Sequence, residues 1–228
     1  APDKAAFSET VISPDGKLLA FSATSDSKRQ LWVRSLHSLA AQPLAGTDEA
    51  RDPFWSPDSR WIGFFAQRKL KKIEASGGPA QTLCDVATPR GGGTWNQDGV
   101  ILYSQIGPGL SRVPAQGGTP RQITRDRGSG EQHRFPMFLP GGRHYLYLIT
   151  SSDPNVAGIC LGALDRQDRT RLVGDISSAA YAAGPTGQGY LLFVREGTLM
   201  AQPLDAAKEK ATGEAFPVAK VGSSFATA

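Results

Sequence analysis

The segment Ser56–Ala66, with the sequence SPDSRWIGFFA, joins a tight polar turn to a strand of alternating, aromatic-rich residues. Similar segments occur at Ser13–Ala23 (SPDGKLLAFSA), Asn96–Ser104 (NQDGVILYS) and Leu139–Leu148 (LPGGRHYLYL). In each copy Asp, Asn or Gly residues suit a turn, and the apolar residues that follow suit a strand. Recurrence of one turn-and-strand unit along a chain indicates a repeat protein.

The spacing of the repeats indicates which repeat fold this is. Asp15 and Asp58 lie 43 positions apart, and Asp58 and Asp98 lie 40 apart. A second turn motif, centred on a Gly-Gly pair, moves by the same 40 positions from Gly77 to Gly117. A period of roughly 40–45 residues with four strands per unit is typical of a propeller blade. The sequence therefore predicts an all-β fold, a β-propeller of four-stranded antiparallel blades.

Five blades are expected within a single propeller domain that covers residues 1–228. Their approximate limits are 7–44, 53–84, 93–124, 135–173 and 179–219, and residues 220–228 resemble the start of a further blade. The polar stretch 205–211 is expected to be a loop or one helical turn. The ring is expected either to close at five blades or to be an incomplete larger ring. An incomplete ring would leave an open strand edge, through which two chains could associate.

Composition narrows the class of protein. The net charge is +4, and the basic residues are scattered, which favours an ordinary solvated surface over a nucleic-acid-binding patch. The sequence has no run of 18 apolar residues, so it contains no segment that resembles a membrane-spanning helix. The residues after Ala1 do not resemble a signal peptide, so any targeting segment is expected outside this chain. Cys84 and Cys160 fall in non-neighbouring repeats, so no disulfide is expected between them.

Several motifs resemble known propeller repeats. The turn and strand at Ser13–Phe21, followed by Leu31-Trp32-Val33, resemble the TolB-type, WD-like repeat. Longer segments of the sequence are more similar to the C-terminal propeller of bacterial receptor-type serine/threonine protein kinases. The residues that carry this second resemblance are Phe54–Ser59, Gly92–Asn96, His133–Pro140 and Tyr190–Leu199.

The kinase resemblance covers nearly the whole chain and implies a location as well as a fold. In that family the propeller follows a kinase domain and a membrane segment and lies outside the cytoplasm. It therefore implies an extracytoplasmic, periplasmic sensor or scaffold in a bacterium, tethered by a segment outside this chain. That family's ring usually has at least six blades, so the end of this chain departs from the pattern.

The chain carries no recognisable catalytic motif. It has no kinase glycine-rich loop with a strand lysine and no Asp-Phe-Gly, and His133-Arg134-Phe135 lacks the aspartate of a catalytic loop. It has no Gly-x-Ser-x-Gly elbow, and its three histidines lack metal-site spacing. The recurring acids Asp15, Asp58 and Asp98 are assigned to the turns. We expect no enzyme activity, no metal and no cofactor.

One set of acids keeps an enzymatic alternative open. Some propellers are hydrolases that use acids on the innermost strands, and here Glu9 and Asp52 are the clear candidates at such positions. An accessory or gating domain of an oligopeptidase is a related alternative. Acids around a bound calcium ion would favour the enzyme, and a catalytic domain in the same gene would favour the peptidase.

Repeat alignment points to a candidate ligand-binding site. Superposing Pro57 on Pro140 places Arg51 opposite Arg134, and superposing Asp98 on Gly141 places Arg90 opposite His133. Residues just before the innermost strand lie at the mouth of a propeller's central channel. Arg51, Arg90, His133 and Arg134 are therefore predicted to converge there and to bind a carboxylate or phosphate group. The alternative is that they pair with Asp52, Glu49 or Glu131 and complete the channel wall.

The aromatic residues are assigned to packing. Trp55, Trp95 and Phe138 occupy equivalent repeat positions, and Trp32 and Trp61 lie on other predicted strands. We expect them to pack within and between blades rather than to form a ligand cage.

The sequence as a whole predicts a non-catalytic binding module. Its expected partner is a protein or peptide bound on a propeller face, and neither nucleic acid nor insertion into a membrane is expected. A free periplasmic TolB-like scaffold is the first alternative, and the propeller hydrolase or oligopeptidase domain is the second. Fold alone does not decide between them, since propellers have many functions.

Overall fold

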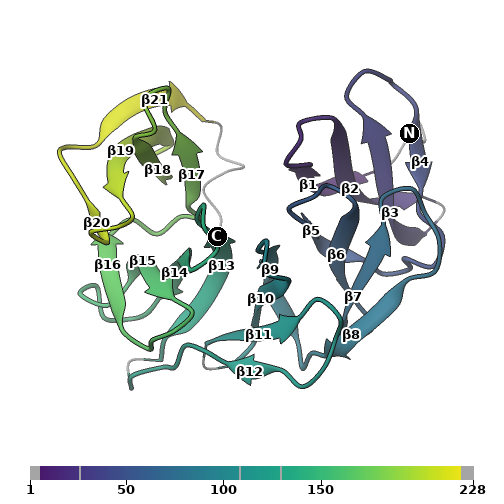
Figure 1. Ribbon diagram of the computed structural model, residues 1–228, viewed down its shortest axis with the longest axis horizontal. Coiled ribbons are helices and arrows are strands. Elements are labelled where there is room, and N and C mark those ends of the chain that lie inside the picture. Colours follow the sequence, from purple (N-terminus) through teal and green to yellow (C-terminus); the bar gives the residue numbers. More distant parts are fainter. Residues whose placement is uncertain (1–5, 26, 108, 129, 222–228) are drawn as a thin grey trace. The chain divides into compact units, whose positions relative to one another are not determined.

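The computed structural model describes residues 6–25, 27–107, 109–128 and 130–221, and their regular structure consists of β-strands in five antiparallel sheets (Figure 1). Four sheets have four strands and one has five. In each sheet the first four strands pair in chain order, as expected when tight turns connect neighbouring strands, and the fifth strand of the larger sheet pairs with that sheet's third strand. The predicted all-β propeller built of four-stranded antiparallel blades is confirmed.

The chain divides into two compact units, one of residues 1–105 and 112–121 and the other of residues 106–111 and 122–228. The first unit holds two whole sheets. These are β1 (Ala6–Ile12), β2 (Leu18–Ser25), β3 (Lys28–Ser35) and β4 (Ala41–Pro43), then β5 (Arg51–Trp55), β6 (Trp61–Ala66), β7 (Lys69–Glu74) and β8 (Gln81–Asp85). A third sheet has the strands β9 (Pro89–Trp95), β10 (Val100–Gln105), β11 (Leu110–Pro114) and β12 (Arg121–Gln122).

The second unit holds the last two sheets. They consist of β13 (Gln132–Phe138), β14 (His144–Thr150), β15 (Gly158–Ala163) and β16 (Arg169–Val173), then β17 (Ala180–Ala183), β18 (Gly189–Arg195), β19 (Thr198–Asp205), β20 (Lys210–Ala211) and β21 (Phe216–Lys220). Both β20 and β21 pair with β19. The stretch expected to be a loop at 205–211 thus ends in a short strand. Of the segment expected to start a further blade, residues 222–228 lie outside the described part of the chain.

Side chains in the turns explain why the repeated motif folds the same way. The Ser13 hydroxyl donates to Asp15 Oδ1 at 2.6 Å and accepts from the Leu18 N–H at 2.9 Å. Ser56 and Asp58 repeat the first bond at 2.5 Å, and the Trp61 N–H donates to Ser56 Oγ at 2.8 Å. In the third copy the Asn96 amide oxygen accepts hydrogen bonds from the backbone N–H groups of Asp98 and Val100. Each turn therefore satisfies its own polar groups and starts the next strand at a fixed residue.

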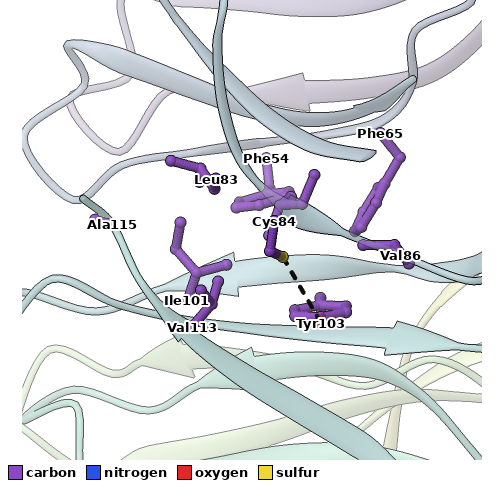
Figure 2. Close-up of a cluster of buried hydrophobic side chains, with 10 residues drawn as sticks. Phe54, Phe65, Leu83, Cys84, Val86, Ile101, Tyr103, Val113 and Ala115 are labelled. Atoms are coloured by element: carbon purple, nitrogen blue, oxygen red, sulfur yellow. Dashed lines mark hydrogen bonds between the residues drawn. The ribbon is translucent and has the colours of Figure 1, made fainter. Parts of the chain in front are cut away.

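Within each unit, hydrophobic clusters lie between neighbouring sheets. In the first unit one cluster joins Leu31 of β3 to Ile62 and Phe64 of β6, and a second joins β5–β8 to β9–β11. Figure 2 shows this second cluster, where the thiol of Cys84 donates to the Tyr103 hydroxyl at 3.8 Å. A third cluster in the second unit joins the two sheets there. Most of the stability is therefore expected to come from contacts between blades.

Phe54 shows how closely two blades approach. Its ring belongs to the second cluster and is almost fully buried, at 6 % exposure. A Cβ atom at Gly63, directly opposite on β6, would overlap this ring, and one at Gly93 on β9 would lie 2.6 Å from it. Only glycine leaves room for the ring on both sides.

Both cysteines are buried free thiols, one in each unit. Burial raises the pKa of both, that of Cys160 to about 11. No helix in the described residues is long and apolar enough to cross a membrane.

Candidate functional site

The first strands of four sheets contain the same backbone irregularity. Pairing shifts register between Ser8 and Thr10 in β1, between Arg51 and Phe54 in β5, between Pro89 and Gly93 in β9, and between Arg134 and Met137 in β13. Each shift marks a β-bulge. The residues in these bulges with a left-handed backbone are Glu9 (φ 55°), Asp52 (φ 48°) and Phe135 (φ 52°), and Gly92 (φ 77°) takes the equivalent place in β9.

These four bulge residues each lie four positions before the turn residue that begins the repeated motif. The left-handed region costs a non-glycine residue roughly 1–2 kcal/mol, and three of the four are not glycine. β-Bulges re-aim side chains and are over-represented next to functional sites. The bulge end of the first strands is therefore the candidate functional site.

The structure places the predicted arginines beside these bulges. Arg51 comes directly before the bulge residue Asp52, and Arg134 comes directly before Phe135, so the repeat alignment put them at matching positions. Arg90 lies on β9, two positions before Gly92. Arg51 and Arg90 belong to the first unit, whereas His133 and Arg134 belong to the second. The convergence of all four on one channel mouth stays a prediction.

Arg51 and Arg134 differ in their surroundings. The Arg51 side chain is exposed and forms no ion pair or hydrogen bond with any residue that the structure describes. The Arg134 guanidinium is half-buried and donates to the amide oxygen of Gln132. Pairing of Arg51 with Asp52 or Glu49, the alternative considered from the sequence, is thus not seen within the described residues.

His133 lies in a buried polar cluster with Glu131, Thr124 and Arg169. Its Nε2 lies 2.9 Å from Glu131 Oε2 and its Nδ1 lies 2.6 Å from Thr124 Oγ1. Thr124 Oγ1 also accepts the Leu110 N–H at 2.7 Å. These contacts fit a neutral imidazole that donates from Nε2 and accepts at Nδ1.

The charges of this cluster are balanced by Arg169. Its guanidinium forms a bidentate salt bridge with Glu131, in which Nη2 lies 2.9 Å from Oε1 and Nη1 donates a hydrogen bond to Oε2. The hydrogen bonds from Arg169 lower the pKa of Glu131 to about 2, although burial opposes them. Burial lowers the pKa of His133, and Glu131 opposes that shift. Glu131 is therefore an anion and His133 is neutral near pH 7.

A pocket of about 330 Å³ opens beside this cluster in the second unit. Its lining is mainly polar and includes three arginines: Thr124, Arg125, Asp126, Arg127, His133, Tyr147, Gln167, Asp168 and Arg169. The Arg125 side chain is exposed and contacts no partner among the described residues. Because Arg169 is paired with Glu131, the pocket presents two further arginines, Arg125 and Arg127, together with two aspartates, Asp126 and Asp168.

In the first unit the bulges bring two acids together. The Asp52 N–H donates to Glu9 Oε2 at 2.8 Å, which joins β5 to β1. Burial and, to a smaller extent, the Glu9 charge raise the pKa of Asp52 to about 6, against the opposing charge of Arg51. Sequence reasoning named both acids but missed their contact. Their equal offset from Ser13 and Ser56 was the signal that could have revealed it.

Replacing Asp52 by Asn is expected to stabilise the protein at high pH. A carboxyl group with a pKa near 6 when folded, against 3.8 when unfolded, favours folding while it is protonated, and this contribution is lost as the pH rises through 6. Asn tolerates the left-handed backbone and keeps the N–H that bonds Glu9. We expect a gain of about 2 kcal/mol at pH 8 and little change at pH 4, measured by urea unfolding.

The matched control is Asp98→Asn, which removes an exposed carboxylate from a turn. It is expected to change stability by less than about 0.5 kcal/mol at either pH. An equal effect of Asp52→Asn at pH 4 and pH 8 would contradict a titrating Asp52.

No group of three or more His, Cys, Asp and Glu side chains suited to hold a metal ion occurs within the described residues.

These sheets and their packing define the β-propeller class of protein. No family model matches the chain, and no curated protein matches it. Solved structures do match: oligogalacturonate lyase from Vibrio parahaemolyticus has a TM-score of 0.70 at 15 % identity, over 97 % of this chain and 68 % of that one. TolB from Acinetobacter baumannii has a TM-score of 0.69 at 12 % identity, over 95 % of this chain and 55 % of that one.

A prolyl endopeptidase structure also matches, with a TM-score of 0.62 at 14 % identity, over 96 % of this chain and 36 % of that one. The chain thus spans between about one third and two thirds of the length of these proteins. At such identities the similarity shows the fold alone, a β-propeller such as TolB also has. The resemblance to receptor-kinase propellers stays a prediction.

Proposed function

We propose that this chain is a non-catalytic binding module that holds an acidic group of a protein or peptide at the bulge end of its first strands. The observation that carries the proposal is Arg51. It is an exposed arginine that forms no hydrogen bond or ion pair with a described residue, and it lies beside a left-handed Asp52 whose backbone costs energy to maintain. An arginine in such a place offers a planar pair of donors to a carboxylate or phosphate.

The second unit supports the same chemistry. Arg134 occupies the place equivalent to Arg51, and the pocket next to His133 is lined by Arg125, Arg127 and Arg169. Because Arg169 is committed to Glu131, the exposed Arg125 is the more available donor in that pocket.

The test combines Arg51→Ala with Arg134→Ala. The probe is a glutamate-rich decapeptide, and a glutamine-rich peptide of the same length is the uncharged comparison. We expect the wild type to prefer the acidic peptide and the double variant to bind it at least about tenfold more weakly, since a hydrogen bond to a charged group contributes about 1.5–3 kcal/mol.

Arg60→Ala is the matched control, because Arg60 is an exposed arginine in the turn at the other end of the second sheet. It should bind the acidic peptide like the wild type. Equal binding by the double variant and the wild type would refute the proposed site.

The biological setting is proposed on the resemblance stated above. The module would be the extracytoplasmic sensor or scaffold of a bacterial receptor kinase, or a free periplasmic scaffold like TolB. The structural similarity to TolB supports a scaffold role in either setting. The flanking gene sequence distinguishes them, because a kinase domain with an apolar span before Ala1 belongs only to the first.

A propeller hydrolase is the second candidate, and the contact between Glu9 and Asp52 favours it. A carboxyl group with a pKa near 6 beside a second carboxylate resembles a general acid. Oligogalacturonate lyase and prolyl endopeptidase also show that enzymes share this fold. Asp52→Asn separates the candidates, because a hydrolase would lose its activity while a binding module would keep its affinity for the acidic peptide.

Self-association through a strand edge also stays a proposal. All five residues of β21 are exposed, including Phe216 at 46 % and Val218 at 55 %. Among the described strands β21 pairs only with β19. An exposed apolar edge strand is a surface on which a second chain can add a strand.

A further inference from the structure

A second pocket lies in the first unit, at the turn end of the strands and away from the bulges. It has a volume of about 530 Å³, which is within the usual range for small-molecule sites. It opens between the second and third sheets. Its lining residues are Ser56, Pro57, Asp58, Trp61, Lys72, Trp95, Asn96, Gln97, Gly99, Ala115 and Gln116.

Lys72 lies between two tryptophans in this pocket. Its Nζ is 4.5 Å from the centre of the Trp61 ring and 5.9 Å from that of Trp95, both within the range of a cation–π contact. The side chain is half-buried and forms no ion pair or hydrogen bond with any described residue. Beyond the faces of the two tryptophans its ammonium N–H groups contact no partner among the described residues, so they are available to a ligand.

The preceding pair of sheets also has a pocket at the equivalent place, of about 710 Å³, but its lining is different. Leu18 and Trp61 are equivalent, because each lies five positions after the serine that begins its turn. Val33 and Lys72 are equivalent as well. Each pairs with the residue seven positions after that serine, which is Ala20 in the first sheet and Gly63 in the second. Trp55, like Trp95, comes directly before a turn residue. Leu18, Val33 and Trp55 pack in one hydrophobic cluster. The second pair of sheets replaces this apolar contact with Trp61, Lys72 and Trp95.

The indole N–H groups of the tryptophans also differ between the two pairs of sheets. Trp55 Nε1 donates to the Val11 carbonyl at 3.1 Å, which ties two sheets together. Neither Trp61 nor Trp95 forms a hydrogen bond with a described residue through its indole. The Gln97 and Gln116 amides, which are exposed, are also without described partners. The pocket therefore contains a cation, two indole donors and two amides around aromatic walls.

The one carboxylate in the lining is already engaged. Asp58 Oδ1 accepts hydrogen bonds from the Ser56 hydroxyl at 2.5 Å and from the Arg60 N–H at 3.1 Å, both within the turn. These hydrogen bonds, the one from Ser56 foremost, lower the pKa of Asp58. Lys72 thus remains the only cationic side chain in the lining.

We propose that this pocket binds a ligand that carries a carboxylate on a flat or apolar body. The carboxylate would accept from Lys72 Nζ and from an indole N–H, and the body would lie against the faces of Trp61 and Trp95. Two sources share this chemistry, the carboxyl end of a peptide and a sugar acid. This site is separate from the bulge end, where Arg51 lies, and does not depend on the function proposed there.

The experiment measures binding by calorimetry and by the indole N–H signals in an NMR spectrum. The peptide probe is an N-acetylated tripeptide that ends in Phe, compared with its C-terminal amide. The sugar probe is a hexuronic acid, compared with the neutral hexose. At least one acid is expected to bind about tenfold or more tightly than its neutral counterpart and to shift the signals of Trp61 and Trp95.

Lys72→Met retains most of the apolar stem and removes the charge, and it should abolish the preference for the acid. Lys71→Met is the matched control, since Lys71 is the next residue on β7, faces the opposite side of the strand and donates to Gln67. Lys72→Val, which copies Val33, should fold normally and also lose the preference. The proposal is overturned if both acids bind no better than their neutral counterparts, or if Lys72→Met keeps the preference. Arg51→Ala with Arg134→Ala should leave this binding unchanged.

Discussion

Arg169→Met is expected to lower the free energy of unfolding by about 3–5 kcal/mol, the usual cost of removing one partner from a buried ion pair. The side chain of Glu131 is fully buried and faces Arg169 through both of its oxygens. Without Arg169, Glu131 must keep an uncompensated charge or take up a proton. His133 is a poor substitute for the positive charge of Arg169, because burial lowers the pKa of its imidazole and disfavours the protonated form. Urea unfolding at pH 7 measures the loss.

Two further variants test the reason for this loss. Arg169→Met combined with Glu131→Gln removes both charges and should recover part of the stability. Arg143→Met removes an arginine from an exposed pair with Asp165 and should cost less than about 1 kcal/mol. A loss in Arg169→Met no larger than that in Arg143→Met would show that the buried pair contributes little.

Phe54→Ala is expected to lower the free energy of unfolding by about 3–5 kcal/mol, because it removes a buried ring and leaves a cavity between two sheets. Figure 2 shows the ring within the cluster formed by β5–β8 and β9–β11. Glycines lie on both sides of the ring and have no side chain that could move into the space, so the cavity is expected to persist. Denaturant unfolding followed by tryptophan fluorescence measures the change.

A double-mutant cycle identifies the contact. Gly63→Ala alone should destabilise by about 1–3 kcal/mol, because its methyl group would overlap the ring. Together with Phe54→Ala the same methyl group fills part of the cavity, so the double variant should lose less than the sum of the two. Leu39→Ala, at a side chain that is 89 % exposed, should change little. Additive losses would mean that Phe54 and Gly63 are energetically independent.

The fold was largely predictable because turns carry local chemistry. Ser13 and Asp15 bond each other and the backbone two to five residues away, so a short motif is enough to recognise the turn. The alternation after each turn then predicts the second strand. The short strand β20 was missed, since two residues that pair with the end of β19 leave almost no pattern in the sequence.

The site was less predictable, because it depends on backbone geometry and on partners far away in the sequence. Alignment placed Arg51 opposite Arg134, but it could not show that a bulge follows each of them. The alignment that places Arg51 opposite Arg134 also places Ala50 opposite His133, and both of these residues are buried in the structure. The tryptophans were assigned to packing. Recognising the pocket at Lys72 required the register of β6 against β7, which places Gly63 opposite Lys72.

The two cysteines give each compact unit its own built-in chemical reporter. Cys84 belongs to the first unit and Cys160 to the second, and the chain has no other cysteine. Both thiols are buried and their pKa values are raised, so an alkylating reagent reacts with them only after the surrounding sheet opens. Mass spectrometry of the two labelled peptides would therefore time the opening of each unit separately, in the unmodified protein and without an attached dye.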